Sequence, residues 1–202
     1  MKLFYSPGAC SLGIHVVLEE IGAPYELEKV DLSTPVSDRA LTQVNPKSKV
    51  PTLQRDDGSV LTEFPAIAYW LARSHPAAKL FPDDLEGQTR TLEALDFCVA
   101  SLHMQGFSRV FGARRAATPA EAEAMKATGR DIATRAFARL DDMLARREWL
   151  AGDYSIADAS LFYCCCWSGM MEVPMPAHVA AHFARMKARP AVQAALKQEG
   201  LA

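Results

Sequence analysis

One cysteine of this sequence stands where a predicted strand gives way to a helix. Cys10 follows the Pro7-Gly8 turn and immediately precedes an amphipathic segment, residues 11–21. The first turn of a helix presents backbone N–H groups without intrahelical partners and the positive end of the helix dipole, and both favour a thiolate over a thiol. We therefore expect a lowered pKa for Cys10 and a sulfur that binds or attacks a partner. The alternative, from position alone, is a small residue that fills space beside the turn.

Cys10 has no second cysteine at the Cys-x-x-Cys spacing, because Gly13 occupies that position. Any redox cycle would therefore need an external thiol. The other cysteines are Cys98 and the run 164–166, and we expect all four in the core. Consecutive helical residues point about 100° apart, so the run cannot hold one tetrahedral metal ion, and no metal is expected.

A second candidate site is the segment "KVPTL", residues 49–53. Pro51 cannot donate to a sheet ladder, and the peptide bond before it is a candidate for the cis form. In that form the backbone of Val50 would offer its N–H and C=O to an extended ligand. Glu63 begins the next predicted helix, where the Phe64 N–H is expected to be available for an anion. This combination suits a ligand with both an amine and a carboxylate, whereas Glu63 alone would be a residue that favours the helix dipole.

Strands and helices alternate over the first part of the chain and would position these residues. The Asp57-Gly58 pair is a hairpin signal, and the predicted element order is β-α-β-α-β-β-α. The first two strands need a right-handed crossover and pair in parallel, whereas the hairpin strands are antiparallel. The predicted strands are 2–6, 25–31, 52–54 and 60–62, and the predicted helices are 11–21, 36–44 and 65–74.

Strand patterns end near residue 76, and apolar stripes at helical spacing follow, one of which contains Leu92, Leu95 and Leu102. These stripes predict an all-helical bundle. We expect an α/β domain at residues 1–76, a linker at 77–87 and a helical domain at 88–202.

The segment "YSIADASLF" has the spacing of a helix capping box, with Ser155 as the cap and Asp158 three residues later. We interpret it as helix initiation in the folding core rather than as a catalytic pair.

The composition restricts the partners. The net charge of −2 and the absence of a long basic cluster exclude nucleic acid as an expected partner. The longest uncharged run, 159–171, is too short to span a bilayer, and the N-terminus lacks a signal-peptide pattern. Five cysteines without paired spacing indicate a reducing compartment, so a cytoplasmic protein is expected.

Together these motifs resemble those of the cytosolic glutathione transferases, and most closely the bacterial beta class. The resemblance covers essentially the whole chain and rests on "KLFYSPGACSLGIHVVLEE", "VNPKSKVPTL", "LTEFPAIAYWLA", "LHMQGF" and "AGDYSIADASLF". It implies a thioredoxin-like N-terminal domain that binds glutathione as cosubstrate. It also implies a helical domain that forms most of the pocket for hydrophobic electrophiles, a homodimer, and a role in detoxification.

The resemblance assigns the chemistry to three residues. Cys10 would face the glutathione sulfur, and Tyr5 matches a position near that thiol. His103, in "LHMQGF", matches a helical-domain histidine that reaches the Cys10 region. Asp96 precedes His103 by seven residues, which places both on one face of an α-helix.

The resemblance also assigns glutathione contacts. Val50, before the cis-proline Pro51, would pair with the cysteinyl part of glutathione, and Lys49 and Asp96 would be further glutathione-binding residues. Glu63 and the Phe64 N–H would bind the γ-glutamyl end.

The sequence departs from the family pattern at Phe64, where many relatives have Ser, at Pro35, where Lys is frequent, and at Asp96, where Asn is usual. These changes bear on the affinity for glutathione rather than on the fold. The leading function is conjugation of glutathione to electrophiles. The alternatives are thiol-disulfide or peroxide reduction through a mixed disulfide of Cys10 with glutathione, and a non-catalytic ligand carrier or interaction module of the same fold.

Overall fold

The computed structural model describes all 202 residues, which divide by their contacts into two compact units. The first is Met1–Phe81 together with Lys187–Ala202, and the second is Pro82–Met186. The change of unit after Phe81 falls inside the expected linker, 77–87. The helical domain was expected to run to residue 202, but Lys187–Ala202 belong to the first unit, because the last helix packs there.

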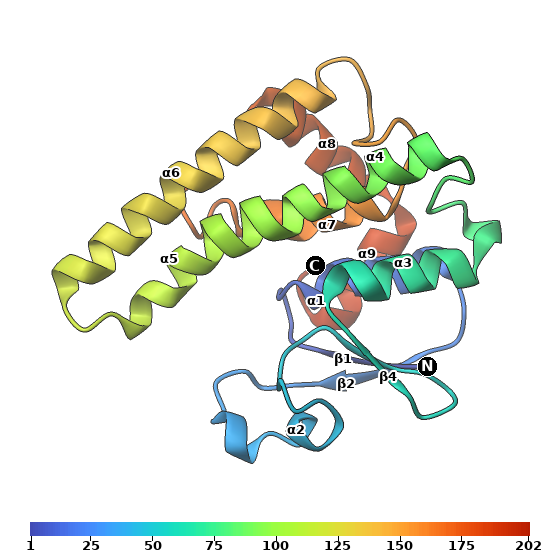
Figure 1. Cartoon of the computed structure of the whole chain (residues 1–202), viewed down its shortest axis with the longest axis horizontal. Helices are drawn as coiled ribbons and strands as arrows, with labels where there is room; N and C mark the ends of the chain where they lie inside the picture. The colour runs from blue at the N-terminus through green and yellow to red at the C-terminus, as the bar shows by residue number, and fades with distance from the viewer. The chain divides into compact units, whose positions relative to one another are not determined.

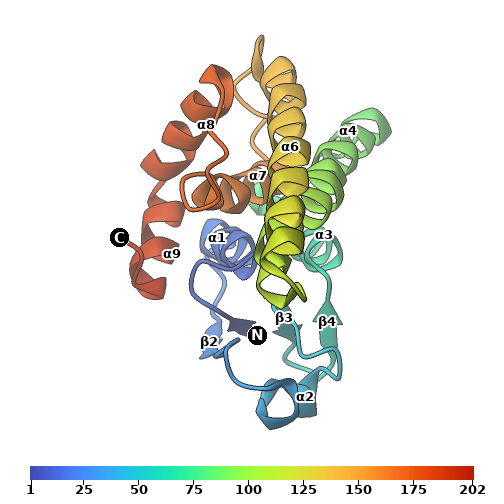
Figure 2. The same ribbon diagram turned by 90° about the vertical axis from the view of Figure 1, so that its left-hand side faces the viewer.

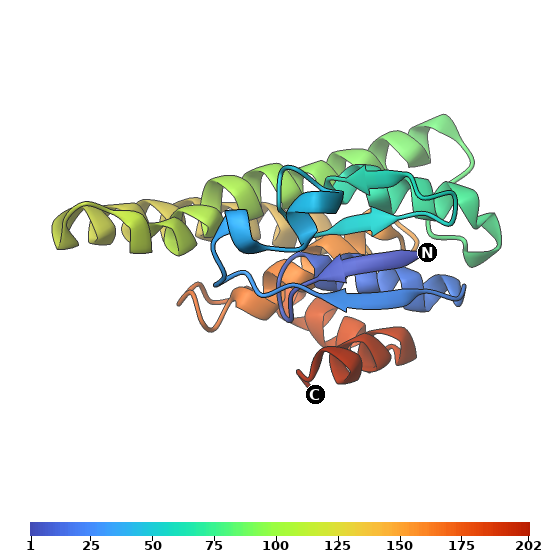
Figure 3. The ribbon, with the colours of Figure 1, turned by 90° about the horizontal axis from the view of Figure 1, so that it is seen from below.

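The first unit contains the predicted β-α-β-α-β-β-α order, built on a four-stranded mixed sheet (Figure 3). In the strand order β2-β1-β3-β4, β1 pairs in parallel with β2 and antiparallel with β3, and β3 pairs antiparallel with β4. The predicted topology is confirmed. The strands are β1 (Lys2–Tyr5), β2 (Glu26–Lys29), β3 (Thr52–Gln54) and β4 (Val60–Thr62).

Helices cover both faces of this sheet (Figure 1). Helices α1 (Ser11–Ile21) and α3 (Phe64–Ser74) pack against each other on one face. The short α2 (Leu41–Val44) lies on the other face, after a 3₁₀ turn at Val36–Asp38, so the single helix expected over 36–44 is interrupted. A second 3₁₀ turn, Pro76–Ala78, follows α3.

The C-terminal helix α9 (Pro190–Glu199) packs along α1 within the first unit (Figure 2). Helix α1 ends where the sequence predicted, at Gly22, whose φ of 69° is the left-handed conformation that glycine adopts without steric cost. Under the helices, Leu3 of β1 and Leu53 of β3 are opposite each other in the sheet, and both are fully buried. Cross-strand apolar pairs of this kind fix the register of the sheet.

The second unit is helical, as expected. A long α6 packs along a π-helical segment and α5, and α4 packs on α7. The elements are α4 (Leu85–Asp96), the π-helical segment (Phe97–Phe107), α5 (Ser108–Gly112), a 3₁₀ turn (Ala113–Arg115), α6 (Pro119–Leu144), α7 (Ile156–Trp167) and α8 (Ala177–Ala188), whose last residues belong to the first unit.

The predicted apolar stripe is correct at Leu95 and Leu102, which are fully buried, and wrong at Leu92, which is 40% exposed. The capping box of α7 is present, with the Ser155 hydroxyl accepting from the Ala157 N–H and the Asp158 carboxylate accepting from the Ser155 N–H. None of the helices combines the length and the apolar character needed to cross a membrane.

Candidate functional site

Cys10 lies at the N-terminal end of α1, directly after the loop that leaves β1. Its Sγ donates to the main-chain carbonyl oxygen of Val50 at 3.4 Å. Two segments separated by forty residues of sequence, the Cys10 turn and the "KVPTL" segment, therefore meet at one point of the first unit. The sequence singled out both segments, and the structure brings them together.

The expected low pKa of Cys10 is wrong for the ligand-free chain. Burial raises the pKa of the Cys10 thiol to about 12. The backbone N–H groups of Cys10 and Ser11 act in the expected direction and lower this pKa, as does the positive charge of Lys49, whereas the charge of Glu63 raises it. Cys10 as a whole is partly exposed, but the partial removal of its sulfur from water outweighs the effect of the helix N-terminus on this pKa. Cys10 is a hydrogen-bond donor in this state and not a thiolate.

The Val50–Pro51 peptide bond is cis, as the sequence suggested. The loop that presents Val50 is shaped by Asn45, a buried residue that sequence reasoning missed. The Asn45 side-chain amide donates to the Lys49 carbonyl at 3.2 Å and to the Thr52 hydroxyl at 2.8 Å, and its oxygen accepts the Lys47 N–H at 3.0 Å. The Asn45-Pro46 pair is a turn signal that could have revealed this role.

Glu63 occupies the position before the first residue of α3, with a φ of 70°. A non-glycine residue in this region costs on the order of 1–3 kcal/mol and is often found at functional sites. The Glu63 carboxylate is largely exposed and pairs with the Lys47 ammonium at 2.7 Å. Lys49 is also exposed, whereas Phe64, the first residue of α3, is buried. The sequence missed Lys47 as the basic partner of Glu63.

Tyr5, the last residue of β1, is buried, and its ring lies 6.0 Å from the ring of His15, centroid to centroid. Burial raises the pKa of the Tyr5 hydroxyl, with the charge of Glu199 acting in the same direction. Tyr5 is therefore protonated at neutral pH. Its role near a ligand thiol stays a prediction.

The two helical-domain candidates, His103 and Asp96, belong to the second unit. His103 is in the π-helical segment, where its Nδ1 lies 3.2 Å from the Tyr163 hydroxyl and its ring contacts Trp167 at 4.8 Å between centroids. Burial lowers the pKa of His103 to about 4, so its imidazole is neutral at neutral pH.

Asp96 is the exposed last residue of α4. The argument that it shares a helix face with His103 assumed 3.6 residues per turn. The i→i+5 pattern of the π-helical segment between them removes that basis.

The remaining cysteines follow the core prediction with one exception. Cys98, Cys164 and Cys165 are buried, whereas Cys166 is partly exposed, so its expected place in the core is wrong. No group of three or more His, Cys, Asp or Glu side chains in the 202 residues could hold a metal ion.

Comparisons with known proteins find a matching family model, similar sequences and similar solved structures. Residues 8–74 match the family model described as "Glutathione S-transferase, N-terminal domain". The chain is 38% identical to glutathione S-transferase GstA of Escherichia coli O157:H7, with all of both chains covered.

Two solved structures are similar over the full length of both chains. One is a sphingomonad glutathione S-transferase complexed with glutathione, with a TM-score of 0.88 and 38% identity. The other is a bacterial beta class glutathione S-transferase from Sphingomonas chungbukensis, with a TM-score of 0.86 and 36% identity.

Proposed function

This chain belongs to the glutathione S-transferase family, and we propose that it binds glutathione in its first unit and conjugates it to small hydrophobic electrophiles. The chain is then a transferase with glutathione as cosubstrate. The observation that carries the assignment of the site is the meeting of the Cys10 sulfur with the Val50 carbonyl, beside a cis-proline.

The Val50 carbonyl oxygen suits the cysteinyl part of glutathione. A carbonyl has two lone pairs, so Val50 can accept an N–H from an extended ligand while it still accepts from the Cys10 thiol. Pairing of a ligand backbone with Val50 would bring the ligand's side-chain sulfur next to Cys10. Glu63, with its exposed carboxylate, would bind the ligand's α-ammonium group. The backbone N–H of Phe64, in the first turn of α3, would bind the carboxylate at the same γ-glutamyl end.

The reaction that we propose is a displacement or addition by the glutathione thiolate. The thiol proton leaves to solvent, and the sulfur forms a bond to an electrophilic carbon. On a chlorinated aromatic substrate, chloride then leaves with the electron pair of the broken bond. Binding brings the two reactants together and stabilises the thiolate, which is the nucleophile.

Protonated Cys10 suits this reaction. A thiol with a pKa of about 12 remains a hydrogen-bond donor at neutral pH, and its single S–H can turn from the Val50 carbonyl to the glutathione sulfur as negative charge develops there. The backbone N–H groups of Cys10 and Ser11, which favour negative charge on the Cys10 sulfur, would act in the same direction on a neighbouring one. The mixed-disulfide route requires Cys10 as a thiolate and finds no support in this geometry.

The helical unit supplies the other part of the proposal. On the family resemblance, His103 and Asp96 are the functional residues of this unit, with His103 acting as a neutral imidazole because of its low pKa. The aromatic rings that contact His103, those of Tyr163 and Trp167, would suit an apolar electrophile. A role in detoxification and a place in the cytoplasm are parts of the same proposal.

A paired activity assay tests the proposed function. Conjugation of glutathione to a chlorinated aromatic electrophile is measured beside reduction of a small mixed disulfide of glutathione. Turnover in the first assay without turnover in the second supports conjugation. The reverse result would assign redox chemistry, and retention on immobilised glutathione without either turnover would assign a carrier.

Cys10 is expected to react slowly with iodoacetamide at neutral pH in the ligand-free protein. Because the thiolate is the reactive form and the pKa is about 12, the labelling rate should rise about tenfold per pH unit between pH 7 and pH 10. Peptide-resolved mass spectrometry measures this rate, with buried Cys98 as the internal reference. A plateau below pH 8.5 would show that Cys10 is a thiolate and would restore the mixed-disulfide alternative.

We predict a homodimer with two-fold symmetry, because the resemblance implies one and because closed symmetric dimers are the commonest assemblies of soluble proteins. Light scattering coupled to gel filtration at micromolar protomer concentration should give about twice the chain mass of 22.1 kDa. A mass equal to that of one chain would contradict the prediction.

A further inference from the structure

The C-terminal helix α9 is tied to α1 by two buried or half-buried polar links. Near the start of α9, the Arg189 guanidinium forms a bidentate ion pair with the Glu20 carboxylate, with Nε–Oε1 at 2.6 Å and Nη2–Oε2 at 3.0 Å. At the end of α9, the side chain of Glu199 enters the first unit beside His15 of α1. The two links hold the same pair of helices, but only the second reaches the loop that carries Cys10.

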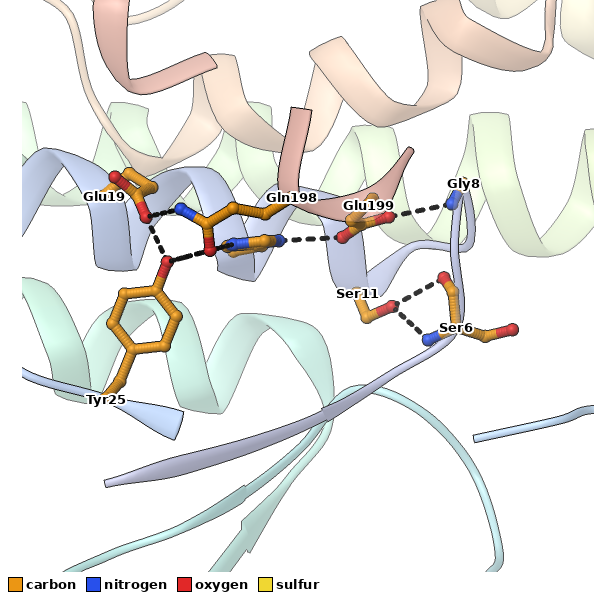
Figure 4. A network of polar contacts seen from close by, with 8 residues as sticks. Ser6, Gly8, Ser11, Glu19, Tyr25, Gln198 and Glu199 are labelled. Atoms are coloured by element: carbon orange, nitrogen blue, oxygen red, sulfur yellow. Dashed lines mark hydrogen bonds and ion pairs between the residues drawn. The ribbon is translucent and has the colours of Figure 1, made fainter. Parts of the chain in front are cut away.

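Glu199 contacts that loop directly (Figure 4). Its Oε2 accepts the backbone N–H of Gly8 at 2.9 Å, and its Oε1 lies 3.0 Å from Nδ1 of His15. The side chains of Glu199 and His15 are both completely buried. A buried carboxylate shielded from water forms stronger hydrogen bonds than an exposed one, so the contact with Gly8 is a firm anchor.

Gly8, which donates to Glu199, is the residue of this loop with a left-handed backbone conformation. Gly8 has a φ of 69° and lies two residues before Cys10. On the other side of the same loop, the Ser11 hydroxyl donates to the Ser6 carbonyl at 3.3 Å and accepts the Ser6 N–H at 3.2 Å. The side chain of Leu201 lies 3.8 Å from the point that a Cβ on Gly8 would occupy. Residues at the end of the chain therefore contact the loop at Gly8, and Ser11 contacts it at Ser6.

The orientation of His15 is fixed from its other nitrogen. His15 Nε2 lies 3.0 Å from the Tyr25 hydroxyl and 3.2 Å from Oε1 of Gln198. The Tyr25 hydroxyl in turn donates to the Glu19 carboxylate (Figure 4). Residues from α1, the start of β2 and the end of α9 thus form one continuous network with Glu199 at its inner end.

We propose that Glu199 is a positioning residue for the reaction: by holding the Gly8 N–H it fixes the loop that places Cys10 and the first turn of α1 against bound glutathione. This inference rests on the proposed glutathione site. Glu199 itself touches neither Cys10 nor Val50, and it acts through the loop. The C-terminus of the chain is thereby part of the machinery of the N-terminal unit.

Three variants separate positioning from general stability. Glu199→Ala removes the acceptor for Gly8. Glu199→Gln retains a side-chain oxygen that can accept the same N–H, so it should preserve function. Glu20→Gln is the matched control, because it weakens the other link between α9 and α1 and leaves the loop contact in place. The readouts are KM for glutathione and kcat in conjugation, together with hydrogen exchange of the peptide that covers residues 6–10.

Glu199→Ala should raise KM for glutathione about tenfold, as expected for loss of one buried hydrogen bond, and should accelerate exchange of the loop amides. Glu199→Gln and Glu20→Gln should stay within about twofold of the unchanged protein in both readouts. Should Glu199→Ala fail to fold, Glu199→Asp, which shortens the side chain by one methylene, takes its place with the same expectations.

Equal effects of Glu199→Ala and Glu20→Gln, or no change in loop exchange, would overturn the positioning role. Failure of the unchanged protein to bind glutathione would instead overturn the proposed function. The exchange measurement needs no glutathione, so the two failures are distinguishable.

Discussion

Substitution of Asp158 by alanine is expected to lower the free energy of unfolding by about 3–5 kcal/mol, because several buried hydrogen-bonding groups lose their acceptor. The Asp158 carboxylate is fully buried and accepts the backbone N–H groups of Leu150 and Ser155 at 3.0 and 2.9 Å. Its Oδ1 also lies 2.9 Å from Nε2 of His182, which is equally buried. Alanine would leave all three groups without this acceptor, and each unsatisfied buried group costs about 1–3 kcal/mol.

Urea unfolding at fixed protomer concentration measures this loss as a lower midpoint with an unchanged slope. Asp141→Ala is the matched control, because Asp141 also accepts two backbone N–H groups, those of His178 and Val179, and also pairs with a histidine ring. The Asp141 carboxylate is 22% exposed, so water can replace it and the expected loss is about 1 kcal/mol. Equal losses in the two variants would show that burial of the Asp158 network is not what stabilises α7.

The same capping box shows what a local pattern can predict. Ser155 and Asp158 were assigned from spacing alone, and the structure contains the two reciprocal hydrogen bonds. The order and pairing of the strands also followed from local signals, since a hairpin turn and a helix crossover each permit one direction of pairing. His182 could not be found in this way, because it reaches Asp158 from twenty-four residues away in the chain.

Prediction failed where helical geometry or long-range packing decided the outcome. The π-helical segment Phe97–Phe107 has no signal in the apolar stripe, and it changes the angular relation of Asp96 to His103. Helix α9 was expected in the helical domain, since its own sequence is an ordinary amphipathic helix. Its partners Glu20 and His15 lie at the opposite end of the chain, so its placement in the first unit is not encoded locally.

Cys10 illustrates two opposing effects on one group. The sequence predicted its position at a helix N-terminus correctly, and the N–H groups there do favour the thiolate. Burial against the Val50 carbonyl acts in the other direction and is larger, but burial cannot be read from a sequence before the partner segment is known. The location of the candidate site was therefore predictable, and the protonation state of its sulfur was not.

Glu63→Gln is expected to weaken glutathione binding by about 1.5–3 kcal/mol, or roughly 10- to 150-fold, through loss of a charge-assisted hydrogen bond. Glu63 is suited to the ligand's ammonium group because its carboxylate already binds an ammonium, that of Lys47, in the ligand-free chain. Titration calorimetry measures the affinity. Because the side chain is largely exposed, the variant should keep its fold, and its circular dichroism spectrum should be unchanged.

The Lys47–Glu63 pair requires a control, since Glu63→Gln also removes this ion pair. Lys47→Met removes the pair from the other side and leaves the Glu63 carboxylate available to the ligand. An exposed pair contributes about 0–1 kcal/mol, so this variant should bind glutathione within a few-fold of the unchanged protein, or more tightly, because a competing cation is gone. Equal weakening in the two variants would mean that the loop held by the pair matters, and not a contact of Glu63 with the ligand. Unchanged affinity in Glu63→Gln would mean that Glu63 does not contact the ligand and serves only as the residue before the first turn of α3.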